Sequence, residues 1–218
     1  MIQEFTYMPE QRKRKPDHYY YKAKEEGYKS RASYKIKQMQ EKFNFLKRGQ
    51  IVIDLCGAPG GWAQVTKEFI GNEGRVMVFD LQLVNNIKGV EGYTVDITSD
   101  EIIPFILAKI NPKTTVDIVL SDCAPKVSGA WHTDQARQIY LAENALAIAV
   151  KLEANVFITK IFEGKDFNEF KINAKKSYST LRVFKPNASR KESAETYIIL
   201  TGYLGKDALI EFESEDYN

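Results

Sequence analysis

What this sequence lacks excludes several classes of protein. None of the apolar runs in its 218 residues approaches the roughly 18 residues that a membrane-spanning helix needs. The first residues carry charge without an apolar stretch behind it, which disfavours a secretory signal, and the chain has no internal repeat, low-complexity block or Gly/Ser linker. A composition of 44% hydrophobic and 28% charged residues is ordinary for a soluble domain. We therefore expect a cytoplasmic protein with one folded domain and no membrane association.

Cysteine is scarce as well. Two residues, Cys56 and Cys123, are too few for a disulfide framework or a zinc site, and we expect no metal. We expect both to be small buried side chains beside the loops discussed below. If both lie at the tips of neighbouring strands they could approach one another, although a disulfide would be unexpected in a reducing cytosol, except in a hyperthermophile.

Acidic residues are few at one end of the chain. Residues 1–50 carry 13 Lys and Arg against 6 Asp and Glu, whereas the remaining 168 residues carry 18 against 23. A basic region attached to a near-neutral domain indicates a polyanionic partner such as nucleic acid, with a merely solvated surface as the alternative. We divide the chain into a basic, Tyr-rich N-terminal arm at 1–27, either mobile or ordered by RNA, one folded domain at 28–204 and an acidic tail at 205–218.

Apolar segments alternate between strand and helix patterns along the domain. Strands are predicted at 50–55, 75–80, 92–96, 116–122, 155–162, 180–186 and 195–203. Helices are predicted at 28–46, 62–70, 99–110, 134–151 and 165–177. Such alternation predicts an α/β fold with an open, mainly parallel seven-stranded sheet and helices on both faces. A loop without an obvious helix joins the last two strands, so we expect one antiparallel strand near the C-terminus.

A glycine-rich turn, DLCGAPGGW from Asp54 to Trp62, follows the first strand. Open α/β sheets bind ligands at this carboxyl edge. Gly57, Gly60 and Gly61 allow the backbone to approach a ligand closely. The G-x-G-x-x-G spacing of dinucleotide binders is absent, and so is the Lys-Ser/Thr of a P-loop, which makes a nicotinamide oxidoreductase or an NTPase a poor fit. A purely structural turn is the alternative for this segment taken alone.

Aspartates end the next three strands. Asp80 can accept hydrogen bonds from the ribose hydroxyls of an adenosine, and Asp96 can accept one from the adenine amino group. Asp122 ends the fourth strand and faces the same crevice. A single aspartate at a strand end is usually a cap or turn residue, but three of them around one glycine turn favour a bound nucleoside.

From about Ser30 to Tyr203 the chain resembles the FtsJ/RrmJ-type ribosomal RNA 2′-O-methyltransferases. The matching segments are SRASYKI (30–36), DLCGAPGGWAQ (54–64), FDL (79–81), SDCAPKVSG (121–129), TKIFEG (159–164), KPNASR (185–190) and ETYIILTG (195–202). The resemblance implies a Rossmann-like methyltransferase fold that uses S-adenosyl-L-methionine. It implies a catalytic tetrad of Lys35, Asp122, Lys160 and Glu195. It also implies contacts with the methyl donor at Gly57, Pro59, Gly60, Gly61, Trp62, Asp80, Leu81, Asp96 and Asp122.

Two features depart from the family pattern, and both concern substrate choice more than chemistry. Lys126 follows the SDCAP proline, where bacterial members have Asn. The basic N-terminal arm is also long. We expect RNA contacts from the arm, the segment before the first helix and a late loop, at Arg12, Lys13, Arg14, Lys15, Lys29, Arg31, Lys185, Arg190 and Lys191. The tyrosines at 19–21 either stack unpaired bases or pack on the domain.

Lys160 interrupts an apolar strand, where an unpaired charge would be costly, and this favours a function for it. Lys35 favours a neutral Lys160, whereas Asp122 and Glu195 favour a charged one, so two roles stay open. As a neutral amine Lys160 would take the proton of a ribose 2′-hydroxyl, and as a cation it would orient that hydroxyl. Methyl transfer itself would be direct and in line.

The resemblance favours one substrate among several. It points to a uridine in the A-loop, in the peptidyl-transferase centre of 23S-type large-subunit ribosomal RNA. The alternatives are a tRNA anticodon loop and a catalytically silent RNA-binding factor of ribosome assembly. We expect ribosomal RNA or the large subunit as the partner, and a monomeric protein.

Overall fold

The computed structural model describes residues 17–111, 114–190 and 192–205. Its helices are α1 (His18–Glu25), α2 (Ser33–Phe43), α3 (Gly61–Ile70), α4 (Ile102–Lys109), α5 (Trp131–Lys151) and α6 (Phe167–Lys175). Its strands are β1 (Ile51–Leu55), β2 (Arg75–Asp80), β3 (Val90–Thr94), β4 (Ile118–Ser121), β5 (Val156–Phe162), β6 (Tyr178–Phe184) and β7 (Glu195–Tyr203).

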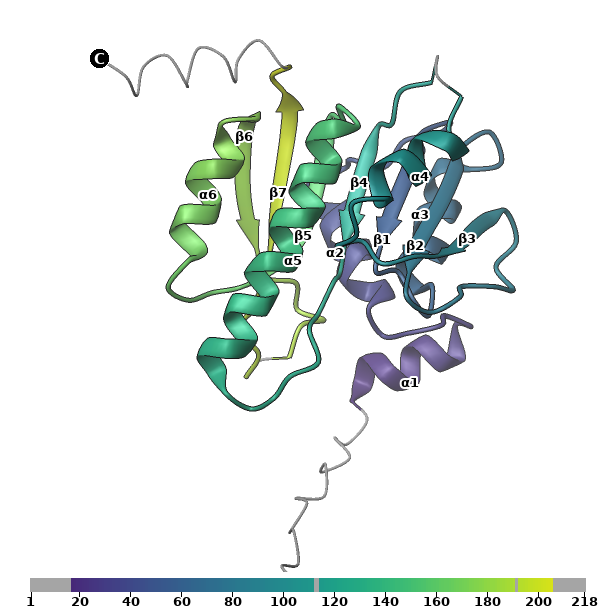
Figure 1. The fold of residues 1–218 in the computed structure, drawn as a ribbon. Coiled ribbons are helices and arrows are strands. Elements are labelled where there is room, and N and C mark those ends of the chain that lie inside the picture. The colour runs from purple at the N-terminus through teal and green to yellow at the C-terminus, as the bar shows by residue number, and fades with distance from the viewer. Residues whose placement is uncertain (1–16, 112–113, 191, 206–218) are drawn as a thin grey trace, which may run out of the picture.

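The strands form a seven-stranded sheet in the order β3-β2-β1-β4-β5-β7-β6 (Figure 1). Strands β1 to β5 pair in parallel, and β7 runs antiparallel to both β5 and β6. The predicted fold, with one antiparallel strand near the C-terminus, is confirmed. The chain order reverses between β1 and β4, so their loops diverge at the carboxyl edge and leave room for a ligand.

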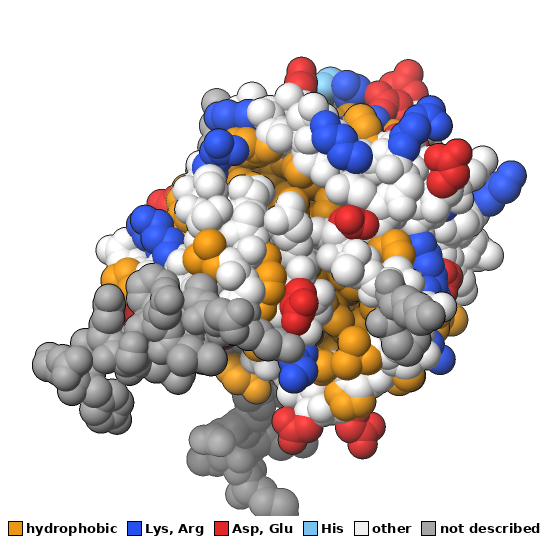
Figure 2. Space-filling model, turned by 90° about the horizontal axis from the view of Figure 1, so that it is seen from above, with side chains coloured by type: hydrophobic (Ala, Val, Ile, Leu, Met, Phe, Trp, Pro, Cys, Tyr) orange, Lys and Arg blue, Asp and Glu red, His pale blue; other side chains and the backbone are white. Residues whose placement is uncertain are grey.

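Helices cover both faces of the sheet (Figure 1). Helices α4, α5 and α6 bury their apolar side chains against one face, and α2 and α3 bury theirs against the other. No helix in the described part of the chain is long and apolar enough to cross a membrane. Figure 2 views the molecule from the side on which the parallel strands begin, where basic and acidic side chains are interspersed among hydrophobic ones.

Several predicted bounds shift by a few residues. The helix predicted over 28–46 is shorter, because the chain reaches α2 through a turn and leaves it at Asn44. Asn44 takes a left-handed conformation, with φ of 51°, and its N–H donates to the carbonyl of Gln40. Asp96 does not end the third strand but lies in the loop that follows β3.

The described part of the predicted N-terminal arm is folded against the domain. The ring of Tyr19 lies 5.3 Å from that of Tyr34 on α2, and Ala23 is buried between them and the late loop. Residues 17–27 therefore pack against the domain in this structure, since aromatic contacts hold a short polar helix in place. Residues 1–16 and 206–218 lie outside the described residues, so the three-part division of the chain stays a prediction.

Candidate active site

A cavity of about 570 Å³ lies at the carboxyl edge of β1, β2 and β4. This volume is typical of a cavity that binds a small molecule. Four of the residues predicted to bind the methyl donor line it, namely Asp80, Leu81, Asp96 and Asp122. Two basic residues in its wall, Arg137 on α5 and Lys126, were not predicted to line the cavity.

A smaller cavity adjoins the first one and shares Asp122 with it. Gly57, Gly61 and Trp62 line this smaller cavity, whereas Pro59 and Gly60 line neither. The Trp62 side chain is buried, and its indole Nε1 donates to the carbonyl of the residue before α2 at 2.9 Å. Trp62 therefore also holds α2 against α3.

Close contacts within the protein itself leave no room for a side chain at the three glycines of the turn. A Cβ at Gly57 would lie 2.6 Å from Oδ2 of Asp54. Gly60 has a φ of +107°, and a Cβ there would overlap the side chain of Ile87. A Cβ at Gly61 would overlap a serine hydroxyl. Contact between these backbones and a ligand stays a prediction.

The carboxylates of Asp80 and Asp96 shape the loops of the large cavity. Asp80 accepts from the backbone N–H of Ala58 at 2.9 Å and of Gln82 at 2.8 Å. Asp96 Oδ1 accepts from the N–H of Thr98 at 2.9 Å and from its hydroxyl at 2.8 Å. An ionised carboxylate has about four lone-pair sites, so both retain capacity for the hydroxyl and amino groups of a nucleoside.

Asp54 supplies an unpartnered acid beneath this turn. The side chain is fully buried, and neither oxygen has a hydrogen-bond partner among the described residues. Burial raises the pKa of Asp54 well above its ordinary value, and the charges of Asp122 and Asp80 raise it further. Asp80 and Asp122 themselves line the large cavity, and acidic groups in its wall would suit the positive charges of S-adenosyl-L-methionine.

The two cysteines are bonded to each other, so the expectation of two unpaired buried side chains is wrong. Leu55 and Ser121 are partners in the register of β1 and β4, and the cysteines follow just beyond them. Neighbouring strand ends therefore bring Cys56 and Cys123 together, with Cα atoms 5.0 Å apart. The bond joins the glycine turn to the loop of Asp122.

The four residues of the predicted tetrad meet as two ion pairs. Lys160 Nζ donates to the backbone oxygen of Asp122 at 2.6 Å and to its Oδ1 at 3.2 Å. Lys35 Nζ lies 2.6 Å from Oε1 of Glu195. Both lysines are buried. Buried lysines need such partners, so the pairs account for charge in an otherwise apolar region.

Tyr197 joins the two ion pairs, and sequence reasoning missed it. Its hydroxyl donates to Oδ1 of Asp122 at 2.7 Å and accepts from Nζ of Lys35 at 3.0 Å. The ring is fully buried and lies 5.7 Å from that of Trp62. A tyrosine within a buried apolar strand is a usable signal, because its hydroxyl must find a polar partner there.

The electrostatics of this cluster fix the proton on Tyr197. Burial raises the pKa of Tyr197 well above its ordinary value, and the charges of Asp122 and Glu195 raise it further. Burial alone would raise the pKa of Asp122, but the charges of Lys160 and Lys35 outweigh burial and lower it. Tyr197 therefore stays protonated as a donor to an ionised Asp122.

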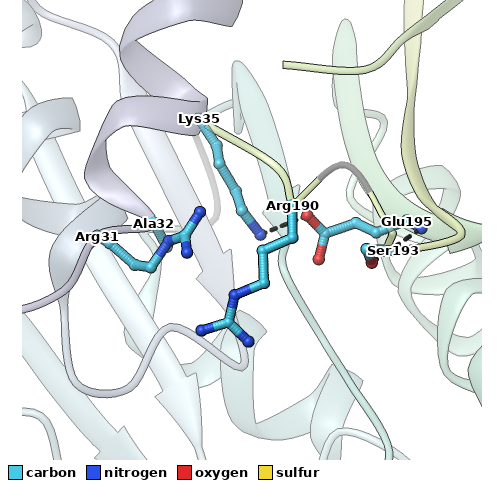
Figure 3. Close-up of a pocket in the computed structure, with 6 residues that line it drawn as sticks. All are labelled: Arg31, Ala32, Lys35, Arg190, Ser193 and Glu195. Carbon is cyan, nitrogen blue, oxygen red and sulfur yellow. Dashed lines mark hydrogen bonds and ion pairs between the residues drawn. The ribbon is translucent and has the colours of Figure 1, made fainter. Parts of the chain in front are cut away.

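Elements from opposite ends of the chain hold the second ion pair. Ser33 Oγ donates to the carbonyl of Gly61 at 3.0 Å, which fixes α2 and places Lys35 over the end of the sheet. Glu195 begins β7 and accepts from Oγ of Ser189 at 2.8 Å. Figure 3 shows Lys35 and Glu195 facing each other beside two arginines.

The predicted RNA-binding residues separate into three groups. Arg31 and Arg190 line a cavity together with Lys35 and Glu195 (Figure 3). The exposed Lys185 donates to the backbone oxygen of Ser193 at 2.6 Å, and Lys29 is exposed outside this cavity. The remaining predicted RNA contacts lie outside the described residues, namely Arg12, Lys13, Arg14, Lys15 and Lys191.

The three tyrosines of the predicted arm do not behave alike. Tyr19 packs on Tyr34, and its hydroxyl accepts from Nε2 of Gln38 at 3.1 Å. Tyr20 and Tyr21 are 47% and 61% exposed. Tyr19 thus follows the packing alternative, whereas stacking of bases on Tyr20 and Tyr21 stays a prediction.

A cavity of this size at the switch point of a parallel sheet, beside two lysine–acid pairs, is typical of an α/β enzyme that binds a small molecule. Residues 28–203 match the model of one family, the FtsJ-like methyltransferases, and the chain belongs to this family. The protein is therefore a methyltransferase, and the resemblance seen in the sequence is confirmed.

Relatives cover most of the chain. The protein named ribosomal RNA large subunit methyltransferase E of Methanocaldococcus jannaschii is 43% identical over 211 residues, which are 93% of this chain and 83% of that protein. The protein of the same name from Hahella chejuensis is 38% identical over 191 residues, which are 87% and 92% of the two chains. A putative ribosomal RNA methyltransferase of Plasmodium falciparum has a similar crystal structure, with a TM-score of 0.72, 25% identity and coverage of 82% and 100%.

Proposed function

We propose that this protein methylates a ribose 2′-hydroxyl of large-subunit ribosomal RNA with S-adenosyl-L-methionine as donor. The observation that carries the proposal is the position of the tetrad between two cavities. Asp122 lines the large cavity that suits the donor, whereas Lys35 and Glu195 line a separate cavity. The names of the curated relatives support ribosomal RNA as the substrate.

The large cavity suits an adenosine with a charged tail. Asp80 would hold the ribose hydroxyls and Asp96 the adenine amino group, while Asp122 would lie near positive charge. Leu81 and the loops around the disulfide would enclose the base. S-adenosyl-L-methionine, when bound, supplies a methyl group on a sulfonium.

Lys160 is the residue that we propose to act on the hydroxyl. It donates two hydrogen bonds to Asp122, which fixes the direction of its Nζ. A charged Lys160 has a third N–H with which to orient the hydroxyl, whereas a neutral one has a lone pair with which to take its proton. Tyr197 and Lys35 hold Asp122 and Glu195 in place around the same point.

We propose the A-loop uridine as the nucleotide, on the strength of the family resemblance. A tRNA anticodon loop is the second candidate, because the site chemistry is the same for any unpaired ribonucleotide. A silent assembly factor is disfavoured by the buried lysine–acid pairs, since binding alone does not need two ion pairs at a cofactor cavity.

The experiment offers the purified protein both substrates. Radiolabelled S-adenosyl-L-methionine is incubated with unmodified large-subunit ribosomal RNA and, separately, with unmodified tRNA, and the 2′-O-methylated nucleotide is mapped. We expect label in one nucleotide of the ribosomal RNA and none with Lys160→Ala. Label confined to tRNA would show that tRNA, and not ribosomal RNA, is the substrate. If the protein binds RNA but labels neither RNA, and also leaves intact large subunits unlabelled, the assembly factor would be supported instead.

A further inference from the structure

Three basic side chains surround the cavity on the substrate side of the tetrad. This cavity of about 280 Å³ is lined by Arg31, Ala32, Lys35, Arg190, Ser193 and Glu195 (Figure 3). Glu195 is engaged with Lys35 at 2.6 Å. Arg31 and Arg190 reach the cavity from opposite sides, one from the segment before α2 and the other from the loop between β6 and β7 (Figure 3).

One carboxylate serves both arginines. Asp17 Oδ2 accepts from Nη1 of Arg31 and lies 4.0 Å from Nε of Arg190. Arg31 also donates through Nη2 to the carbonyl of Ala188. A guanidinium has five N–H donors, so these two bonds leave most of the Arg31 donors and the Nη groups of Arg190 without a partner among the described residues.

The positions of these groups separate an inner from an outer side. Arg31 and Arg190 line both the substrate cavity and a second cavity behind them, whereas Asp17 lines only the second. Asp17 therefore binds the arginines from the outer side and leaves their inner side to the substrate cavity. Two guanidinium groups held side by side with one shared carboxylate retain positive charge, and an anion with several acceptor oxygens suits that arrangement.

We propose that Arg31 and Arg190 clamp one phosphodiester of the RNA, with Asp17 holding the two side chains in position from behind. The inference rests on the proposed function. A ribose 2′-hydroxyl is adjacent to the 3′-phosphate of its own nucleotide, so a nucleotide whose ribose lies at the lysines places that phosphate nearby. The clamp identifies the substrate as an internal ribonucleotide of a chain and positions its ribose for transfer.

The first test counts the phosphates that the arginines neutralise. The probe is a fragment of the ribosomal RNA that the purified protein methylates, bound at a series of salt concentrations. Arg31→Ala and Arg190→Ala should each weaken binding about tenfold but leave the slope of log affinity against log salt nearly unchanged, because the remaining arginine still neutralises the phosphate. Only the double variant should lose that contact, and its slope should become less steep by about 0.7.

Arg48→Ala is the matched control, since Arg48 is exposed in the loop before β1, at the opposite end of the sheet. It should leave both the affinity and the slope unchanged. A slope that becomes less steep by about 0.7 in each single variant, and by about twice that in the double variant, would mean two separate phosphates and would overturn the clamp. So would an unchanged slope in the double variant. Methylation of the same RNA fragment by the wild-type protein is measured alongside, so failure of the clamp is distinct from failure of the proposed function.

Asp17 is tested by a substitution that keeps its structural role. Its Oδ1 caps α1 by accepting from the N–H of Tyr20, and asparagine caps equally well. Asp17→Asn should raise KM for RNA severalfold with kcat unchanged, and should have a smaller effect in the Arg31→Ala background, where only Arg190 remains for Asp17 to hold. An unchanged or lower KM, or an effect that is undiminished without Arg31, would overturn the positioning role.

Discussion

Tyr197 and Lys160 are partners in the antiparallel register of β5 and β7, and both bind the same oxygen of Asp122. The Tyr197 hydroxyl donates to Oδ1 at 2.7 Å and Lys160 Nζ lies 3.2 Å from it. Neighbouring strands thus present a neutral donor and a lysine to one carboxylate. The orientation of the Asp122 carboxylate therefore depends on both residues.

Removal of the Tyr197 hydroxyl tests this dependence. Tyr197→Phe keeps the ring that packs on Trp62 but leaves Asp122 and Lys35 short of one hydrogen bond each. A hydrogen bond to a charged group contributes about 1.5–3 kcal/mol, so we expect the melting temperature to fall by several degrees. We also expect kcat to fall by about tenfold to a hundredfold, because Asp122 is held less firmly. Steady-state kinetics and a melting curve measure the two. Unchanged kcat would show that Lys160 alone orients Asp122.

Substitution of Lys160 should separate chemistry from donor binding. Lys160→Ala removes the group proposed to act on the hydroxyl, so turnover should fall by about 10²–10⁴, while affinity for S-adenosyl-L-methionine should stay nearly intact. Asp122→Ala should lose both, since Asp122 also lines the donor cavity, and Glu195→Ala should be milder. The pH profile of the wild type distinguishes the roles of Lys160. A rate that rises with pH indicates a base, and a rate that falls once the lysine deprotonates indicates an orienting cation.

The seven strands, their mainly parallel arrangement and the helices on both faces could be predicted because apolar runs of strand length alternate with helical patterns. The strands at 75–80 and 195–203 have the predicted bounds. The members of the tetrad came from the family resemblance, but their division into two ion pairs could not be predicted. That division depends on where α2 docks on the sheet, and the contacts that fix α2, such as Ser33 with Gly61, link segments far apart in the chain.

The misses have the same physical origin. Pairing of the cysteines depends on the register of β1 with β4, which composition does not reveal. Tyr197 looked like one more apolar position of its strand, because alternation gives the face of the sheet and not the polar neighbour that lies there. Docking of α1 depends on ring contacts between Tyr19 and Tyr34, and its polar sequence has no strong apolar face.

Asp54 makes stability depend on pH in an unusual direction. Its pKa is raised in the folded protein, so the folded state binds more protons than the unfolded state above the ordinary value of 3.8. Stability should therefore fall as pH rises from about 4 through the raised pKa. The lowered pKa of Asp122 acts in the opposite direction and below that window. An asparagine cannot ionise, so the melting temperature of the Asp54→Asn variant should fall less than that of the wild type between about pH 4 and about pH 8. Parallel curves for the two proteins would contradict a raised pKa.

The bond between Cys56 and Cys123 should contribute to stability. It closes a loop with a sequence separation of 67, and a cross-link of that length restricts the unfolded chain by about 4 kcal/mol in the entropic model. Dithiothreitol should accordingly lower the urea midpoint of the oxidised protein. The double variant Cys56→Ala/Cys123→Ala is the control and should not respond to the reductant. A wild-type midpoint that is insensitive to dithiothreitol would show that the bond adds nothing.

The basic run at Arg12, Lys13, Arg14 and Lys15 should be tested without disturbing α1. Deletion of residues 1–16 removes these charges and leaves Asp17 and the helix in place, whereas deletion of 1–27 would also remove contacts of Arg31. If the run neutralises phosphates, each lost contact should make the fall of log RNA affinity with log salt less steep, by about 0.7 in slope. Deletion of the acidic residues 206–218 is a control of similar length and should not lower the slope. Equal slopes for the wild type and the 1–16 deletion would mean that the basic run is solvated and makes no phosphate contact.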